Sequence, residues 1–158
     1  MAALQWSESL SLDLPPMDQT HQEFVELLAQ VEGADDAQLV PAWRALIDHT
    51  VEHFGTEDAW MRSTGFSSAN CHTVQHRVVL EVMREGLVQG LKNETEAIRR
   101  MARELAVWFV QHAQTMDAAL ALHLRSVGFD AATQQVRMPQ GLPAQPLTGC
   151  GSAACATA

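Results

Sequence analysis

Residues 49–61 of the chain read HTVEHFGTEDAWM, and this stretch places two ionisable side chains where a helix should be apolar. The inward positions around it recur in alternating steps of four and three residues, which is typical of one face of a bundle helix. These positions are Leu39, Trp43, Leu46, Thr50, His53, Glu57 and Trp60. His53 and Glu57 therefore occupy core positions, where unpaired ionisable groups cost free energy. The stretch predicts a buried helix with a functional pair of side chains on its inner face.

Three further segments have a helical period, so the sequence predicts an all-α protein. Asp18 and Asn70 are of residue types that cap helix N-termini, and Gly33 and Gly128 are suited to end helices. The expected helices span residues 18–33, 35–64, 70–90 and 93–127. Because short turns join them, four such helices should pack as an up-down-up-down antiparallel four-helix bundle.

Both ends of the chain lack a helical period. Residues 1–16 alternate between polar and apolar types over residues 9–14 and end in two prolines, so we expect an extended N-terminal arm. Residues 131–158 are rich in Gln, Pro, Gly, Thr and Ala, a composition that favours a flexible C-terminal tail. We therefore expect a four-helix domain over residues 1–130 and a tail over residues 131–158. The spacing of Cys150 and Cys155 in the tail is too weak a motif to assign them a role.

The composition indicates a single globular domain. The 158 residues are 47% hydrophobic and 18% charged, and the formal net charge is −9, which argues against binding nucleic acid or an anionic membrane surface. No apolar run approaches the roughly 20 residues needed to span a bilayer. The first residues have no basic start and include Glu8 and Asp13, unlike a secretory signal. We expect a cytoplasmic protein.

Each expected helix places a histidine at an inward position. His53 and Glu57, like His72 and His76, are four residues apart, which brings both members of a pair to one site. The full set of candidate metal ligands is His21, His53, Glu57, His72, His76, His112 and Asp117. Five imidazoles and two carboxylates exceed the needs of one ion but suit two ions that share bridging carboxylates. Without a cysteine ligand, the set fits iron best, with manganese or copper as alternatives.

From Trp6 to about Gly128 the chain resembles the hemerythrins of the bacterial single-domain type. The resemblance rests on the Trp6 arm and, in order, on MDQTHQEF, HFGTEDAWM, HTVQH and WFVQHAQTMD. It implies a non-haem di-iron centre with an oxo or hydroxo bridge, and reversible binding of dioxygen. By position, one iron would have three histidine ligands, the other would have two, and two carboxylates would bridge them. These are, in that order, His72, His76 and His112, then His21 and His53, then Glu57 and Asp117.

Asp117 does not fit this assignment if the last helix is regular. Five residues at about 100° each would place Asp117 about 140° from His112 around the helix axis. We hypothesise a π-type bulge or local unwinding between these two residues, because such a turn would return both to the inner face.

The resemblance also implies a dry dioxygen pocket beside the iron with two histidines, because water there would promote oxidation of the metal. The candidate pocket residues are Phe24, Phe54, Trp108 and Phe109. Phe109 stands where many relatives have a smaller aliphatic residue, and plain core packing is the alternative interpretation for all four aromatic side chains.

Three other residues near the predicted ligands have less specific interpretations. His49 lies one turn before His53, so it either hydrogen-bonds this ligand or packs between helices. We expect His123 at the surface and Cys71 as a small buried residue.

The leading functional hypothesis is therefore a non-enzymatic protein that binds dioxygen for storage, delivery or scavenging. A sensor of dioxygen, redox or iron state is one alternative, although such proteins usually carry an output domain. A di-iron enzyme acting on peroxide or nitric oxide is another, but we find no dedicated proton donor in the predicted pocket.

Overall fold

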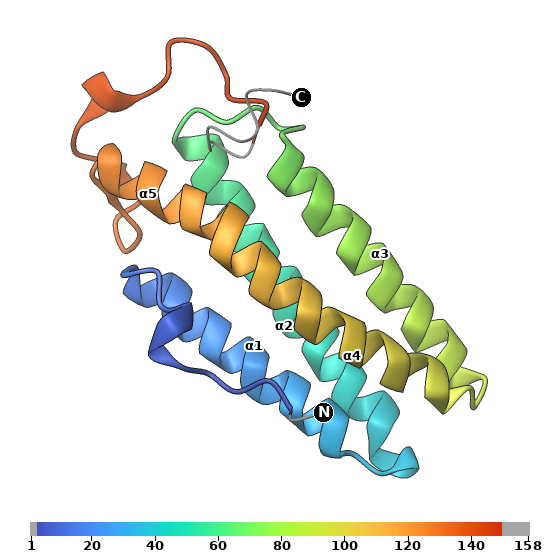
Figure 1. The fold of residues 1–158 in the computed structure, drawn as a ribbon. Helices are drawn as coiled ribbons and strands as arrows, with labels where there is room; N and C mark the ends of the chain where they lie inside the picture. Colours follow the sequence, from blue (N-terminus) through green and yellow to red (C-terminus); the bar gives the residue numbers. More distant parts are fainter. Residues whose placement is uncertain (1–2, 150–158) are drawn as a thin grey trace.

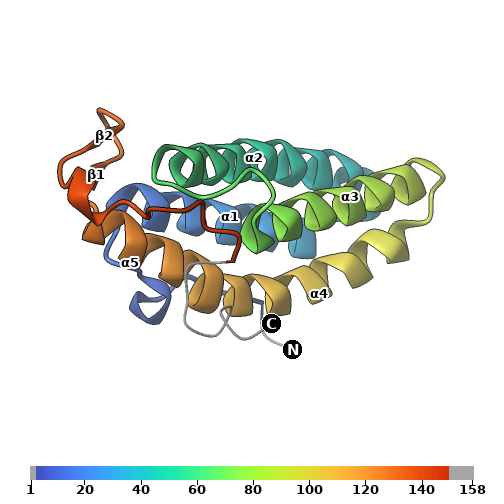
Figure 2. The same ribbon diagram turned by 90° about the horizontal axis from the view of Figure 1, so that it is seen from above.

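The computed structural model describes residues 3–149, and its helices form one elongated bundle (Figure 1). The helices are α1 (Pro15–Gly33), α2 (Asp36–Ser63), α3 (Cys71–Leu91), α4 (Thr95–His112), a π-helix (Ala113–Asp117) and α5 (Ala118–Ser126). The last three follow each other without a gap and form the fourth rod of the bundle (Figure 2). Helices α1 and α3 each pack against both α2 and α4. This arrangement confirms the predicted all-α four-helix bundle.

Side chains cap the N-termini of α2 and α3, and the cap of α3 is the expected Asn70. The Asp35 side chain accepts a hydrogen bond from the backbone N–H of Gln38 at 2.9 Å, and the Asn70 side chain accepts bonds from His72 and Thr73. Each cap satisfies backbone donors that have no partner inside the helix. The cap of α3 matters most for the site, because it fixes the first turn, in which His72 lies.

Helix α1 begins at Pro15, whereas the sequence suggested a start near Asp18. Proline is tolerated in the first turn because the N–H that it lacks would have no partner there. The Asp18 carboxylate instead accepts hydrogen bonds from the backbone N–H of Leu12 at 2.7 Å and from the Ser11 hydroxyl at 2.8 Å. These bonds hold the N-terminal arm against the start of α1.

The core consists of two apolar clusters with a polar layer between them. The larger cluster includes Phe24, Leu28, Trp43, Leu46, Met83, Ile98 and Phe109, and the smaller one includes Met17, Trp60, Met61, Phe66, Leu120 and Leu124. Along every rod, the predicted metal ligands fall in sequence between residues of the two clusters. The apolar layers on both sides keep water away from these ligands.

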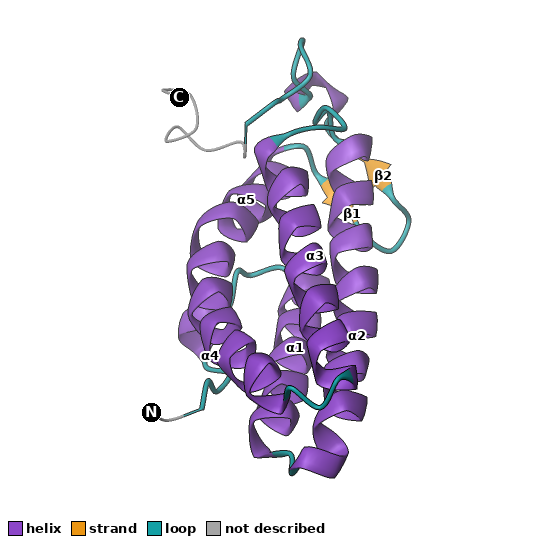
Figure 3. Ribbon diagram, turned by 90° about the vertical axis from the view of Figure 1, so that its right-hand side faces the viewer, coloured by secondary structure: helices purple, strands orange, loops and turns teal. Residues whose placement is uncertain are grey.

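Residues 129–141 contain short regular elements that the composition of the expected C-terminal tail did not predict. Strands β1 (Phe129–Asp130) and β2 (Gln135–Val136) form a short antiparallel hairpin, visible at the end of the bundle in Figure 3. A 3₁₀ turn (Pro139–Gly141) follows, and the chain then returns to the loop between α2 and α3. Cys150 and Cys155 lie outside the described residues.

The returning segment, residues 143–148, pairs with the α2–α3 loop through its backbone. Leu147 donates to the carbonyl of Gly65 at 2.9 Å and accepts from Ser67 at 2.8 Å, and Thr148 accepts from Cys71 at 2.9 Å. The Leu147 side chain packs on the smaller apolar cluster. Composition alone did not reveal this segment, because a few backbone bonds and one leucine hold it. The domain boundary at residue 130 stays a prediction.

Within residues 3–149, no helix is long and apolar enough to cross a lipid bilayer.

Candidate metal centre

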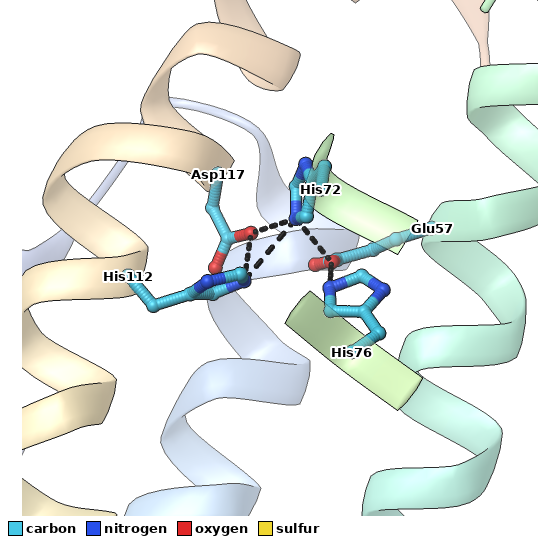
Figure 4. A group of neighbouring side chains, drawn as sticks. All are labelled: Glu57, His72, His76, His112 and Asp117. Atoms are coloured by element: carbon cyan, nitrogen blue, oxygen red, sulfur yellow. Dashed lines mark hydrogen bonds and ion pairs between the residues drawn. The ribbon is translucent and has the colours of Figure 1, made fainter. Parts of the chain in front are cut away.

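The structure brings all seven predicted ligands together in the polar layer. They come from α1, α2, α3 and the fourth rod, and none of them is more than 4% exposed. Figure 4 shows five of these side chains pointing toward one another: Glu57, His72, His76, His112 and Asp117. The ligand atoms of these five lie within 4.8 Å of one another, and those of His21, His53 and Glu57 form a second such group.

A wide turn of the fourth rod carries Asp117 into the cluster. Residues Ala113–Asp117 are π-helical, directly after His112 at the end of α4. The extra residue per turn cancels the rotation that a regular helix would give over five residues. The hypothesis of a π-type bulge between His112 and Asp117 is confirmed.

The Glu57 carboxylate lies between two sets of histidines, one that includes His21 and His53 and one that includes His72 and His76. Its Oε1 is 3.0 Å from Nε2 of His53 and 3.7 Å from Nε2 of His21. Its Oε2 is 3.3 Å from Nε2 of His76 and 3.7 Å from Nε2 of His72. Each oxygen therefore faces a different set.

The Asp117 carboxylate divides in the same way. Its Oδ1 is 3.0 Å from Nε2 of His72 and 3.1 Å from Nε2 of His112, whereas its Oδ2 is 3.1 Å from Nε2 of His21. The first set therefore consists of three histidines and one oxygen from each carboxylate. The second set consists of two histidines and the other two oxygens.

The cluster fits a metal ion because its buried polar atoms do not satisfy one another. Among the described residues, Nε2 of His21 and His76, Oε2 of Glu57 and both oxygens of Asp117 are buried without a hydrogen bond of good geometry. Such atoms cost free energy when nothing satisfies them. Nε2 of His72 also lies only 3.1 Å from Nε2 of His112, so two imidazole nitrogens aim at one point. Cations at the centre would satisfy all of these atoms at once.

Comparisons with known proteins cover the part of the chain that contains the cluster. The sequence matches the family described as the hemerythrin HHE cation-binding domain over residues 14–122, a span that contains all seven clustered side chains. A bacteriohemerythrin of Ralstonia nicotianae is 37% identical over 131 residues, which cover 83% of this chain and 96% of that protein. The chain belongs to the hemerythrin family. The resemblance inferred from the motifs is thereby confirmed.

More distant relatives of this hemerythrin-family chain are also bacteriohemerythrins. A bacteriohemerythrin of Pseudomonas aeruginosa is 24% identical over 122 residues, 75% of this chain and 79% of that protein. One of Stenotrophomonas maltophilia is 26% identical over 127 residues, 77% of this chain and 81% of that protein. Hemerythrins bind non-haem iron, and the histidine and carboxylate groups of this chain could hold a metal ion.

Both carboxylates of this hemerythrin site are held in the ionised form. Burial alone would raise the pKa of Glu57, but the charge of His53, the close contact with His21 and the hydrogen bond with His53 lower it well below the usual value. Burial and the charge of Glu57 would likewise raise the pKa of Asp117, but the charge and close contact of His112 and the close contact of His21 outweigh them and lower it. The centre therefore offers two anions to a cation.

Two of the histidines hold protons strongly when no metal is bound. Burial would lower the pKa of His21, but its bonds to Asp117 and Glu57 outweigh burial and raise the pKa to about 9. Burial would also lower the pKa of His76, but Asp58 and Glu57 raise it to about 9. A metal ion must displace these protons before it can bind the two imidazoles.

Two supporting residues were missed from the sequence. Nδ1 of His76 is 2.8 Å from Oδ1 of Asp58, and Nδ1 of His112 is 2.6 Å from Oε1 of Gln75. These acceptors orient each ring so that Nε2 points into the cluster, and such partners tune the basicity of a metal-binding histidine. Each stands directly beside a predicted ligand in the sequence, but off the inward stripe.

The four aromatic residues predicted to line a dioxygen pocket divide between the two histidine sets. Phe109 stacks on Phe24 at 4.6 Å between ring centroids and lies edge-on to His21 at 5.2 Å. Phe54 instead stacks on His76 at 3.9 Å, and Trp108 stacks on His112 at 4.5 Å. Phe24 and Phe109 therefore border the set with two histidines, whereas Phe54 and Trp108 mainly fix ligand rings of the other set.

The remaining histidines lie outside the cluster. Nε2 of His49 is 3.3 Å from Oε2 of Glu23 on α1, so His49 bridges two helices and does not hydrogen-bond His53. His123, expected at the surface, is half-buried and donates to the Thr64 carbonyl at 2.9 Å at the end of α2. Cys71 is half-buried, and burial raises the pKa of its thiol.

Proposed function

We propose that this hemerythrin-family chain binds two iron ions and uses them to bind dioxygen reversibly, for storage, delivery or scavenging. The observation that carries the proposal is the division of both carboxylates between the two histidine sets. Two neighbouring ions that share bridging carboxylates need one oxygen of each carboxylate on either side. Glu57 and Asp117 meet this requirement together.

The unequal histidine sets indicate where dioxygen would bind. The ion held by His72, His76 and His112 would have one more protein ligand than the ion held by His21 and His53. The second ion would thus keep a coordination position for an external ligand. Two bound iron ions would supply the reversible change of one electron each on which dioxygen binding depends.

Two aromatic residues on one side of the second set would limit the access of water to this position. The stacked rings of Phe24 and Phe109 close its side toward the larger apolar cluster. Exclusion of water limits the side reactions that oxidise such a centre irreversibly. Phe54 and Trp108 hold His76 and His112 in place on the opposite side.

Anaerobic reconstitution with ferrous iron followed by dioxygen tests the proposal. The expected result is about two irons per chain and a visible charge-transfer band that appears with dioxygen and disappears when dioxygen is removed, through repeated cycles. One irreversible conversion to an oxidised form would contradict reversible binding and would favour a sensor or an enzyme with the same centre.

Two histidine variants test the ligand assignment. His53→Ala should lose the ion of the second set, because it removes one of only two imidazoles there. His49→Ala, one helical turn away, should still bind both ions, because His49 bonds to Glu23 and not to the cluster. Normal iron content in His53→Ala would refute the assignment.

A further inference from the structure

A hollow between α1 and α2 reaches two residues of the metal centre. Its volume is about 150 Å³, and its most buried lining residues are the ligands His53 and Glu57 and the apolar residues Met17 and Trp60. The residues that line it nearer the surface include Thr20, Glu23, His49, Glu52 and Thr56. Since the seven ligands are nearly inaccessible to solvent, a metal ion needs such a route to reach them.

Side chains that bind metals form a graded series along this hollow. The Glu23 side chain is 48% exposed, that of His49 is 16% exposed, and that of His53 is only 3% exposed. Oε2 of Glu23 is 3.3 Å from Nε2 of His49, and the ring centroids of His49 and His53 are 6.0 Å apart. An ion could thus pass from a surface carboxylate to an imidazole and then to a buried ligand without losing all its partners at once.

The polar atoms and charges of the hollow suit a cation. Nδ1 of His53 and Nδ1 of His49 are both buried without a hydrogen-bond partner among the described residues. The residues that line the hollow include three carboxylates, Glu23, Glu52 and Glu57, and neither lysine nor arginine. Converging charge of one sign in a cleft raises the local concentration of the opposite ion and its rate of association.

A second hollow has the opposite character. It lies between α3 and α4, has a volume of about 170 Å³, and is lined mainly by apolar residues such as Val78, Val82 and Trp108. It reaches Trp108 but no ligand side chain. An apolar hollow of this kind offers no partner for a hydrated cation.

We propose that the α1–α2 hollow is the port through which a divalent cation reaches the metal centre, with Glu23 and His49 as transient ligands on the way. The proposal rests on the proposed function in one respect, namely that the centre binds metal. The port would add two transient metal ligands to the seven ligands of the centre. Glu23 and His49 would set the rate at which metal is taken up and not the amount that is finally bound.

The test compares rates of cobalt uptake by the metal-free full-length chain. Co²⁺ is mixed with the protein in a stopped-flow spectrometer, its visible absorption reports coordination, and the bound metal is measured after equilibration. Glu23→Gln is compared with Glu26→Gln. Both glutamates lie on α1, are exposed, and accept a hydrogen bond from the glutamine four residues before. Only Glu23 lines the hollow.

Glu23→Gln should slow uptake about fivefold at low salt, which is the effect of removing one charge about 5 Å from the path of a divalent ion in partly screened water. Glu26→Gln should have the wild-type rate. The wild-type rate should also fall more steeply with added salt than the rate of Glu23→Gln, whereas the final cobalt content should be equal in all three proteins.

A second variant tests the path without changing charge. Thr20→Phe places a large side chain in the hollow and should slow uptake, again with an unchanged final cobalt content. Equal rates in wild type, Glu23→Gln and Thr20→Phe would overturn the port, as would a lower final content in Glu23→Gln, which would make Glu23 a resident ligand. Failure of the wild-type chain to bind cobalt or iron would instead refute the proposed function.

Discussion

Raising the pH from 7 to 9 should tighten the binding of each metal ion by nearly two orders of magnitude, because one histidine in each set of ligands is protonated in the metal-free protein. The pKa values of His21 and His76 are both raised to about 9, whereas only neutral imidazole coordinates a metal ion. Because pH 7 is about 2 units below these pKa values, displacing each proton costs about 3 kcal/mol and weakens the apparent affinity about 100-fold. Both side chains are at most 1% exposed, so solvent screens little of this effect.

The assay is a metal titration against a competing chelator between pH 6.5 and 8.5. His76 belongs to one set of ligands and His21 to the other, so each ion should displace about one proton. The logarithm of each binding constant should therefore rise by about one per pH unit, after correction for the chelator. Calorimetry in two buffers with different ionisation enthalpies should count about two released protons per chain.

Asp58→Asn separates the two protons. It removes the carboxylate at 2.8 Å from Nδ1 of His76, so the pKa of His76 should fall. The binding constant of the ion held by His76 should then depend less steeply on pH. The slope of the ion bound by His21 should stay near one. Asp48→Asn, an exposed change on the same helix, should leave both slopes unaltered. Slopes near zero in the wild type, or slopes indifferent to Asp58→Asn, would refute the reasoning.

The stability of the metal-free protein should depend on pH in the opposite sense. A histidine whose pKa rises from 6.5 to about 9 on folding stabilises the fold fully below pH 6.5 and loses this contribution as the pH rises through 9. The melting temperature measured by calorimetry should therefore fall as the pH rises over this range. A constant or rising melting temperature would contradict this. Phe109→Leu removes the ring that lies edge-on to His21. It should lower the free energy of unfolding by about 1–3 kcal/mol and speed irreversible oxidation of the iron-loaded protein. An unchanged oxidation rate would show that Phe109 only packs in the core. Gly65→Ala should cost about 1–3 kcal/mol in urea unfolding, because φ is +99° and the new Cβ would clash with Pro143, whereas Gly55→Ala has free space and should stabilise α2 by up to about 1 kcal/mol. Equal effects of the two glycine variants would argue against the clash.

The features of the centre that could be predicted are those that each helix determines by itself. A spacing of four residues fixes His53 and Glu57 on one face whatever the helix packs against, and the same holds for His72 and His76. The π-helical turn was also predictable, because a spacing of five is incompatible with a regular helix that directs both His112 and Asp117 inward.

The features that could not be predicted depend on the register between segments. Asp58 and Gln75 reach histidine rings because of how α2, α3 and α4 are rotated and shifted against one another, and the spacing within one helix does not contain that information. The segment that ends at Leu147 was missed for a related reason. Its backbone bonds to the α2–α3 loop give no periodic signal in the sequence.

The two apolar clusters on either side of the polar layer have a consequence for cooperativity. In a continuous core, each layer of side chains supports the next, so the helix ends unfold together. Here the middle layer holds seven ionisable side chains, and several of their buried polar atoms have no hydrogen-bond partner without metal. Metal ions would then couple the two ends of the bundle into one cooperative unit. In the metal-free chain, the smaller cluster should open on its own, and its amide protons should exchange with solvent earlier than those of the larger cluster.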